Sequence, residues 1–251
     1  MTYYNDLTND DKRVSIFKEA IIEKAHGLTY DLGTGSGILA EIASKYSEKV
    51  YAFEINPLVI KRYTKGNLEG IENVSIIQAD ASTHTFEEIP DVVICEMLDT
   101  ALIDEEQVLV INNILDYTKE DTIFIPKLTY DTIQVGFSNI SHIVYLEEGR
   151  PSFKTYSNEI KYNQVDFSEK INPYFDKDIE INIIQSGTIN SILITTYTYV
   201  TEELFTGPTP MLNPPLVIPV NETEVNEGDI IKLNLKYIMG GGLNTITANI
   251  E

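Results

Sequence analysis

Three glycines at alternate positions, Gly33, Gly35 and Gly37, lie in the stretch Tyr30-Asp-Leu-Gly-Thr-Gly-Ser-Gly-Ile-Leu-Ala40. Glycine adopts positive φ without steric cost and lets a ligand approach the backbone closely. A helix that begins directly after the turn presents free N–H groups and the positive end of its dipole to such a ligand. The stretch predicts a strand, a turn and a helix, with either a ligand at the turn or none.

Acidic residues stand at the ends of four apolar runs, at Asp31, Glu54, Asp80 and Glu96. The predicted strands are residues 28–32, 50–53, 74–79, 91–95 and 122–125, and the predicted helices between them are 38–46, a segment from Pro57 and 105–117. This alternation predicts an α/β fold whose parallel sheet is covered on both faces. Ligands of such sheets bind at the carboxyl ends of the strands, and packing alone does not explain four acids there.

A further helix is predicted before the glycine turn, and it contains Arg13. Asn9 or Asp10 is suited to cap this helix. Considered alone, Arg13 is best explained as a solvated surface charge. The apolar stripe that predicts the helix consists of Ile16, Phe17, Ala20, Ile21 and Ala25.

After Pro126, short β-type runs separated by Gly, Asn and Pro clusters replace this alternation, as is typical of antiparallel sheets. We therefore predict an α/β domain over residues 1–127 and an all-β, antiparallel C-terminal domain over residues 128–251, with the ligand site between them. Residues 147–176 are rich in charged and polar side chains and are predicted to project or to be mobile. The predicted β runs are 130–137, 143–146, 160–167, 179–185, 191–200 and 230–237.

The chain of 251 residues has a formal net charge of −21, one cysteine and no tryptophan. An acidic surface repels phosphate backbones, so we expect no nucleic-acid partner and favour a cationic one, although adaptation to solubility or salt is the simpler source of most of the charge. No internal disulfide can form, and no apolar run approaches the ~18 residues of a membrane span. We therefore expect a cytoplasmic protein without a membrane partner. His26, His84 and His142 lack the spacing of a metal site or a triad, so no metal is predicted.

The glycine turn behind Asp31 resembles the first motif of class I S-adenosyl-L-methionine (SAM) methyltransferases, because its third glycine comes one residue earlier than in a dinucleotide site. The resemblance implies SAM as the cofactor. It also implies that Glu54 accepts from the ribose hydroxyls and that Asp80 or the backbone after it reads the adenine edge. The implied cofactor-binding residues are Arg13, Asp31, Gly33, Thr34, Gly35, Gly37, Leu39, Glu54, Asp80, Ala81 and Glu96.

Two glutamates, Glu96 and Glu105, bracket eight residues after the fourth predicted strand. This loop resembles the double-E loop of the protein arginine methyltransferases, and the resemblance extends to residues 31–40, 92–96 and 122–126. It also extends to the helix of Arg13, since an arginine in that family's helix pairs with the carboxylate of the cofactor. The resemblance implies that Glu96 and Glu105 are catalytic and hold a cationic nitrogen. In the alternative, one of them, in the first place Glu105, only caps the next helix.

The sequence departs from that family in three motifs, and its β domain is also shorter than is usual in the family. The family's Tyr-Phe-x-x-Tyr motif has no counterpart upstream of Arg13, where Tyr3 and Tyr4 are the remaining candidates for an aromatic wall. The double-E loop begins Glu-Met-Leu-Asp instead of Glu-Trp-Met-Gly, and Pro210-Met-Leu212 stands where the family has Thr-His-Trp. Arginine is therefore less well supported as the substrate than SAM is as the cofactor.

The sequence as a whole predicts a SAM-dependent methyltransferase that moves a methyl group to a nitrogen of a cationic protein or small molecule. Two alternatives stay open. The chain is a class I methyltransferase of the same architecture that acts on a small molecule, or it binds SAM without catalysis. The resemblance also implies a homodimer, although no dimerisation arm is recognisable in the sequence.

Overall fold

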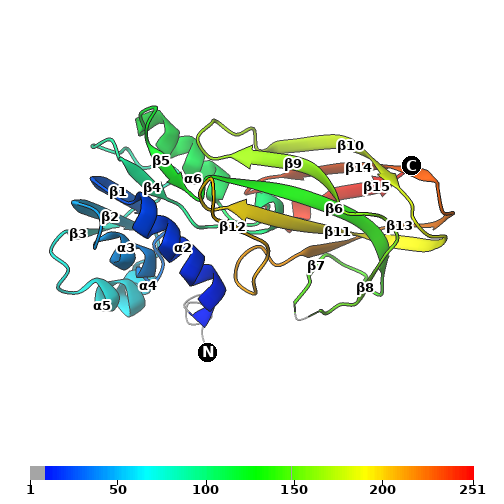
Figure 1. The fold of residues 1–251 in the computed structure, drawn as a ribbon, viewed down its shortest axis with the longest axis horizontal. Coiled ribbons are helices and arrows are strands. Elements are labelled where there is room, and N and C mark those ends of the chain that lie inside the picture. The colour runs from blue at the N-terminus through cyan, green and yellow to red at the C-terminus, as the bar shows by residue number, and fades with distance from the viewer. Residues whose placement is uncertain (1–8, 148) are drawn as a thin grey trace.

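The computed structural model of the chain describes residues 9–147 and 149–251. Figure 1 shows an elongated molecule with an α/β part at one end and a part built from antiparallel strands at the other. The chain passes from the first part to the second between β5 (Ile123–Ile125) and β6 (Leu128–Ser138). The division into separate domains at 127/128 stays a prediction. Tyr3 and Tyr4 lie outside the described residues.

Five parallel strands form the sheet of the α/β part, in the order β3-β2-β1-β4-β5. Besides β5, the strands are β1 (Leu28–Leu32), β2 (Lys49–Glu54), β3 (Val74–Gln78) and β4 (Val92–Ile94). The three residues of β4 are fully buried, as expected for a strand covered on both faces. The strand order reverses between β1 and β4, and open α/β sheets bind ligands at such a point. The predicted α/β fold with a parallel sheet is confirmed, and its sheet is Rossmann-like.

The helices of the α/β part are short apart from the first. They are α2 (Asp11–Lys24), α3 (Ile38–Ala43), α4 (Pro57–Val59), α5 (Lys65–Leu68) and α6 (Gln107–Ile114), with 3₁₀ turns at Thr100–Leu102 and Leu115–Tyr117. Asp10 caps α2, because its carboxylate accepts from the backbone N–H of Arg13 at 3.1 Å. Phe17, Ala20 and Ile21 bury the apolar face of α2. The helix predicted over 105–117 begins two residues later, at Gln107.

The second part consists of two antiparallel sheets. Its other strands are β7 (Val144–Tyr145), β8 (Phe153–Thr155), β9 (Ile160–Asp166), β10 (Tyr174–Asn182), β11 (Gly187–Tyr199), β12 (Phe205–Thr206), β13 (Leu216–Val225), β14 (Ile230–Ile238) and β15 (Thr247–Ile250). The larger sheet follows the path β7-β13-β11-β6-β8, and β9 and β12 pair with β6 and β11 beside it. The smaller sheet has the order β10-β14-β15. The two sheets contact through rings such as Tyr162 on β9 and Phe175 on β10, whose centroids are 5.4 Å apart.

The second part differs from the prediction in the segment 147–176 and in strands β12, β13 and β15, which were not predicted. Residues 147–176 do not project as one segment, because β8 and β9 within them pair with β6 and β10 begins at Tyr174. The prediction was wrong because the charged and polar side chains of this segment lie on the solvent face of paired strands. Strand β13 was not predicted because it contains Pro219, which cannot donate to a ladder. Pro219 lies opposite Ser191, directly beside a shift in the β11–β13 register that accommodates the missing N–H.

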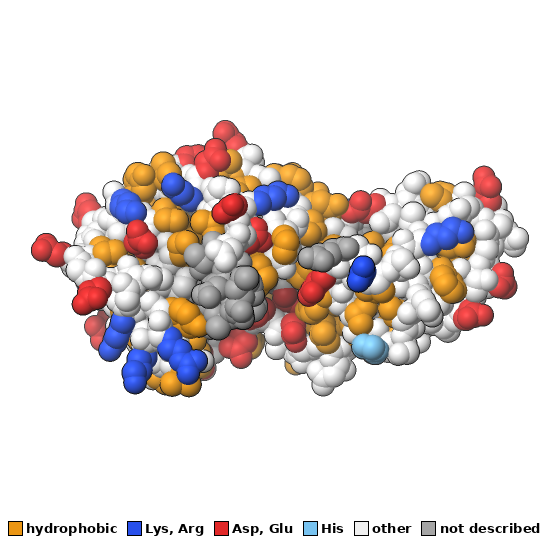
Figure 2. Space-filling view, turned by 90° about the horizontal axis from the view of Figure 1, so that it is seen from below, with side chains coloured by type: hydrophobic (Ala, Val, Ile, Leu, Met, Phe, Trp, Pro, Cys, Tyr) orange, Lys and Arg blue, Asp and Glu red, His pale blue; other side chains and the backbone are white. Residues whose placement is uncertain are grey.

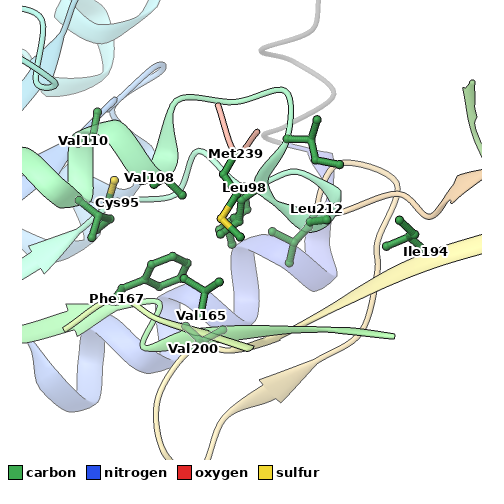
Figure 3. Close-up of a cluster of buried hydrophobic side chains, with 14 of the residues drawn as sticks. Cys95, Leu98, Val108, Val110, Val165, Phe167, Ile194, Val200, Leu212 and Met239 are labelled. Carbon is green, nitrogen blue, oxygen red and sulfur yellow. The ribbon is translucent and has the colours of Figure 1, made fainter. Parts of the chain in front are cut away.

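An apolar core joins the two parts, as Figure 3 shows. Cys95, Leu98, Val108 and Val110 enter this cluster from the α/β part. Their counterparts from the antiparallel part are Val165, Phe167, Ile194, Val200, Leu212 and Met239. Burying such side chains stabilises the contact by roughly 25 cal/mol per Å² of apolar surface removed from water. The segment that follows β4 is therefore packed against both parts.

Candidate active site

A cavity of about 310 Å³ opens beyond the carboxyl ends of β1, β2, β3 and β4, the size of a small-ligand pocket. Every predicted site residue except Gly37 lines it. These residues are Arg13, Asp31, Gly33, Thr34, Gly35, Leu39, Glu54, Asp80, Ala81, Glu96 and Glu105. Asp31 and Glu96, 65 positions apart, are brought together because parallel strands end at one edge of the sheet, and helix α2 adds Arg13.

Gly37 does not line the cavity but begins α3. It adopts a φ of 85°, and a Cβ there would lie 3.0 Å from Leu68 Cγ. This conformation favours glycine, so Gly37 shapes the turn from behind. Its place among the cofactor-contacting residues is not supported by this geometry.

The glycine turn is held open toward the cavity by backbone hydrogen bonds. The N–H groups of Gly33 and Thr34 both donate to the carbonyl of Phe53 at 3.0 and 2.8 Å. Gly33 has a φ of 76°, and a Cβ there would lie 2.6 Å from Met97 Sδ. Glycine is therefore required at position 33 by its positive φ and by the close packing of the Met97 side chain.

Glu54 is fixed at the end of β2 and is 7% exposed. One carboxylate oxygen accepts from the N–H of Gly35 at 3.0 Å, and the other accepts from the N–H of Asn56 at 2.8 Å. These two bonds orient the carboxylate, whose remaining lone pairs can accept from a pair of hydroxyls. Its predicted ribose contact stays a prediction.

Asp80 follows β3 and forms a turn with Ser82. Its carboxylate accepts from the Ser82 N–H at 2.9 Å and from the Ser82 hydroxyl at 2.6 Å. These bonds lower the pKa of Asp80. Because the side chain is committed to this turn, the backbone around Ala81 is the better placed group to meet an adenine edge.

Asp31 is almost completely buried at the end of β1, with 2% of its surface exposed. The Thr34 hydroxyl donates to its carboxylate at 2.5 Å. Burial nevertheless raises the pKa of Asp31 to about 7, and the nearby Glu96 carboxylate adds to the effect. A buried carboxylate of this kind gains most from a cationic ligand.

Arg13 reaches from α2 into the cavity and forms an ion pair and hydrogen bond with Glu96. The side chains are only 7% and 6% exposed, respectively. Burial raises the pKa of Glu96, and the Arg13 guanidinium opposes that shift. The structure thus places Arg13 in the site, against the carboxylate of Glu96. Its predicted contact with the carboxylate of the cofactor stays a prediction.

Two side chains that the sequence analysis missed position the Glu96 loop. Gln107 is fully buried. Its amide donates to the Cys95 carbonyl at 2.7 Å and accepts from the Met97 N–H at 3.0 Å, so it holds the backbone on both sides of Glu96. Asp99 accepts from the N–H groups of Ile103, Asp104 and Glu105 at 3.1, 2.8 and 3.3 Å.

Glu105 lies at the exposed rim of the same cavity. Partial burial and the neighbouring Asp104, Glu96 and Glu106 raise its pKa. Helix α6 has Glu106 as its N-cap residue, and that side chain makes no capping hydrogen bond. The N-cap position of α6 is therefore Glu106 and not Glu105, and the catalytic role of Glu105 stays a prediction.

The antiparallel part contributes Met211 to the wall of the cavity. Its N–H donates to the Asp10 carboxylate at 3.1 Å, and the Thr209 hydroxyl donates to the same oxygen. The segment that stands in place of Thr-His-Trp therefore does lie at the site, tied to the start of α2. It contributes the Met211 thioether to the wall of the cavity.

The cavity is strongly acidic. Among the described residues that line it, Arg13 is the one Lys or Arg against six carboxylates, those of Asp31, Glu54, Asp80, Glu96, Glu105 and Glu106. On the face drawn in Figure 2, by contrast, acidic side chains are scattered over both parts with Lys and Arg among them. The excess of carboxylates in the cavity favours a cationic ligand there.

Other reactive groups lie apart from this chemistry. Cys95 is buried, and burial raises its pKa, so its thiol is not a nucleophile at neutral pH. Within residues 9–147 and 149–251, no group of His, Cys, Asp and Glu is arranged to hold a metal ion. No helix in the same ranges is long and apolar enough to cross a membrane.

Comparison with known sequences finds relatives along the whole chain. A family model described as a methyltransferase domain matches residues 30–125. An uncharacterized protein of Methanocaldococcus jannaschii is 43% identical over 99% of this chain and 96% of its own length. An uncharacterized protein of Methanothermobacter thermautotrophicus is 39% identical over 99% of this chain and 97% of its own length. A ribosomal protein L11 methyltransferase of Caldanaerobacter subterraneus is 32% identical over 43% of this chain and 34% of that protein.

Comparison with solved structures finds the same two-part fold in protein arginine methyltransferases. Arabidopsis thaliana protein arginine methyltransferase 10 matches with a TM-score of 0.79 and 15% identity, over 92% of this chain and 86% of that one. The Trypanosoma brucei PRMT1 enzyme–prozyme complex with AdoHcy matches with a TM-score of 0.76 and 16% identity, over 91% and 85%.

The sheet, the glycine turn and the acidic cavity agree with these matches. SAM is the cofactor, and the glycine turn and the buried carboxylates fit a ligand that carries a sulfonium, an ammonium and a ribose. The chain belongs to one family with the two archaeal proteins, and it is a class I SAM-dependent methyltransferase that resembles the protein arginine methyltransferases.

Proposed function

We propose that the chain transfers a methyl group from SAM to a nitrogen of a cationic acceptor, in the manner of a protein arginine methyltransferase. The observation that carries the proposal is the pair formed by Glu96, buried in the cavity, and Glu105 at its rim. Both carboxylates belong to the same cavity as the glycine turn, so an acceptor held by them would lie next to the cofactor.

The residues of the cavity divide into two groups in this proposal. Asp31, Glu54 and the glycine turn at Gly33 and Gly35 would hold SAM, with Arg13 at its carboxylate end. When bound, SAM supplies a methyl group already activated on a sulfonium. The chain therefore contributes positioning and the exclusion of water.

A guanidinium stays protonated in water and offers several N–H donors in one plane. Glu96 and Glu105 can accept paired, charge-assisted hydrogen bonds from it and turn one nitrogen toward the cofactor. Methylation of that nitrogen releases a proton. Glu105, exposed at the rim and with a raised pKa, is suited to accept this proton and pass it to water.

A second candidate function is methyl transfer to a small molecule. The observation in its favour is Met211, which lines the cavity where the related family has an imidazole. The partial relative named ribosomal protein L11 methyltransferase favours a protein acceptor instead. Binding of SAM without catalysis is the third candidate.

Glu96→Gln tests the proposal, because the amide keeps a hydrogen-bond acceptor for Arg13 but loses the charge. SAM binding, measured by calorimetry, should persist. Transfer of labelled methyl from SAM to a cell lysate should fall by on the order of 100-fold, the cost of losing one electrostatic contact in a dry site. Glu169→Gln, at an exposed position, is the matched control and should transfer like the wild type.

Separation of the labelled lysate into protein and small-molecule fractions distinguishes the first two candidates. Label in arginine side chains of protein supports the proposal, and label in the small-molecule fraction supports the second candidate. Unchanged transfer by Glu96→Gln would overturn the role of the glutamate pair. Binding of SAM with no transfer by the wild type would leave the third candidate.

We further propose that the protein works as a homodimer in the cytoplasm. The oligomer is suggested by the PRMT1 neighbour, which is part of a heterotetrameric complex, and the compartment by a single buried cysteine. Light scattering after size-exclusion chromatography, with and without SAM, measures the oligomeric state directly.

A further inference from the structure

We propose that Thr196 and Asp131, two buried residues of the antiparallel part, are positioning residues that set the conformation of the loop between Glu96 and Glu105. The inference rests on the proposed function, in which Glu96 and Glu105 hold the acceptor. In this proposal the conformation of the acceptor site depends on strands β6 and β11. Neither strand contributes a lining residue to the cavity proposed for SAM.

The loop contains a strained turn. Ala101 and Leu102 have φ of 56° and 58°, the left-handed region that residues with a Cβ rarely adopt. Both side chains are fully buried. Two successive residues in this region persist only where their surroundings hold them, and such strain is concentrated at functional sites.

The Thr196 hydroxyl is the contact that holds Ala101. It accepts from the Ala101 N–H at 2.8 Å and donates to the Asp131 carboxylate at 2.6 Å. Asn163 donates to the other carboxylate oxygen of Asp131 at 3.1 Å. Thr196 and Asp131 are 0% and 1% exposed, so water does not replace these bonds. One hydroxyl thus links the turn to a buried carboxylate through a donor and an acceptor at once.

The rest of the turn is attached to the same part of the molecule. The Thr100 hydroxyl donates to the Pro214 carbonyl at 2.7 Å. The N–H groups of Gly240 and Gly242 donate to the carbonyls of Leu102 and Ile103 at 2.8 and 2.9 Å. Each of these partners belongs to the antiparallel part, and Glu105 follows two residues after Ile103.

These contacts separate the two halves of the site. The cofactor residues Asp31, Gly33 and Glu54 lie on strands and turns of the parallel sheet. The acceptor carboxylate Glu105 is placed by a turn that the other part holds. Loss of the Thr196 hydroxyl should therefore disturb methyl transfer while leaving SAM affinity unchanged.

Thr196→Val and Thr196→Ser test the two hydrogen bonds of the Thr196 hydroxyl, to Ala101 and to Asp131. Valine has the shape of threonine but can neither donate nor accept, whereas serine keeps the hydroxyl. Thr129→Val is the matched control, because Thr129 on β6 is equally buried and its hydroxyl has no hydrogen-bond partner among the described residues. Three measurements are made on each variant of the 251-residue chain. SAM affinity is measured by calorimetry on the ligand-free protein, and amide hydrogen exchange and transfer of labelled methyl to lysate are measured with SAM present.

We expect Thr196→Val to speed hydrogen exchange in a peptide spanning 97–106 by at least about 10-fold, with peptides of β1 and β2 unchanged. Transfer should fall by about 10- to 100-fold, as for a misplaced catalytic group, at unchanged SAM affinity. Thr196→Ser should restore both properties, and Thr129→Val should match the wild type.

Wild-type exchange of the 97–106 peptide in Thr196→Val would overturn the proposal, as would wild-type transfer. Faster exchange over the whole chain, with weaker SAM binding, would also overturn it, because Thr196 would then only stabilise the fold. If the wild type transfers no methyl group, the proposed function fails. The hydrogen-exchange measurement then tests by itself whether Thr196 holds the loop.

Discussion

Asp31→Asn should make the protein more stable and weaken its binding of SAM. The reason is that burial raises the pKa of Asp31 from 3.8 to about 7. Each pKa unit corresponds to ~1.36 kcal/mol, so an ionised Asp31 destabilises the ligand-free fold by at most roughly 4 kcal/mol. Because the folded-state pKa is raised, the stability linked to this group is complete below its unfolded pKa and is lost as the pH rises through about 7.

Asparagine keeps an oxygen that can accept from the Thr34 hydroxyl. Its NH₂ group, however, would replace an oxygen that accepts from the Ala40 backbone, a mismatch of about 1–3 kcal/mol. The net gain at pH 8 is therefore about 1–3 kcal/mol, or about 2–4 °C in Tm for each kcal/mol in a chain of this length. The gain should shrink toward pH 5, where Asp31 is already protonated in the folded protein.

Thermal unfolding at pH 8 and pH 5 measures the stability, and calorimetry measures SAM affinity. Loss of one charge-assisted contact should weaken SAM binding by on the order of 10- to 100-fold. Asp80→Asn is the control, because hydrogen bonds from Ser82 lower the pKa of Asp80 and its removal should give no gain in stability. A lower Tm for Asp31→Asn at pH 8 would refute the reasoning from burial, and unchanged SAM affinity would refute the place of Asp31 in the cofactor site.

Three other perturbations have expected outcomes. Gly33→Val places a Cβ at a φ of 76° and 2.6 Å from Met97 Sδ, so the glycine turn should distort and calorimetry should detect no SAM binding. Retained SAM affinity would contradict the proposed role of the glycine turn in cofactor binding. Gln107→Leu leaves two buried backbone groups unpaired at about 1–3 kcal/mol each, so Tm should fall and methyl transfer should drop more than SAM affinity; equal losses would point to a structural role alone. Since the pKa values of Glu96 and Glu105 are raised, transfer should increase with pH over a range that lies above the ordinary pKa of a glutamate, whereas a flat profile would mean that neither carboxylate has to ionise.

The parallel sheet and most of the cavity could be predicted from sequence because their signals are local. Each strand is a short apolar run, and the chain places an acid or a glycine directly after it. The strands lie parallel in one sheet, so residues such as Asp31, Glu54 and Glu96 meet at one edge without any further information. Arg13 was predicted as a site residue only from the family resemblance, because its local sequence alone indicates a surface charge.

The side chains that orient the double-E loop could not be predicted in this way. Gln107 occupies the first turn of an amphipathic helix, where a polar residue is expected on the surface, yet it is fully buried. Thr196 bonds to a residue 95 positions away, and no periodicity in either segment reports that contact. Strand β13 could not be predicted because it contains Pro219, which argues against a strand. The register shift that accommodates this proline is a property of the paired strands β11 and β13 and cannot be recognised in one sequence segment.

The buried pair of Arg13 and Glu96 has a consequence for selectivity. A cavity with six carboxylates would collect any small cation from the medium if all of them were open to it. Glu96, the deepest carboxylate of the pair proposed for catalysis, is instead already neutralised by a guanidinium of its own chain. A stray lysine or metal ion would have to displace a partner that is shielded from salt by burial. An incoming anion that attracts Arg13 would relax this restraint, so Glu96 would become available to a cation when such a ligand binds.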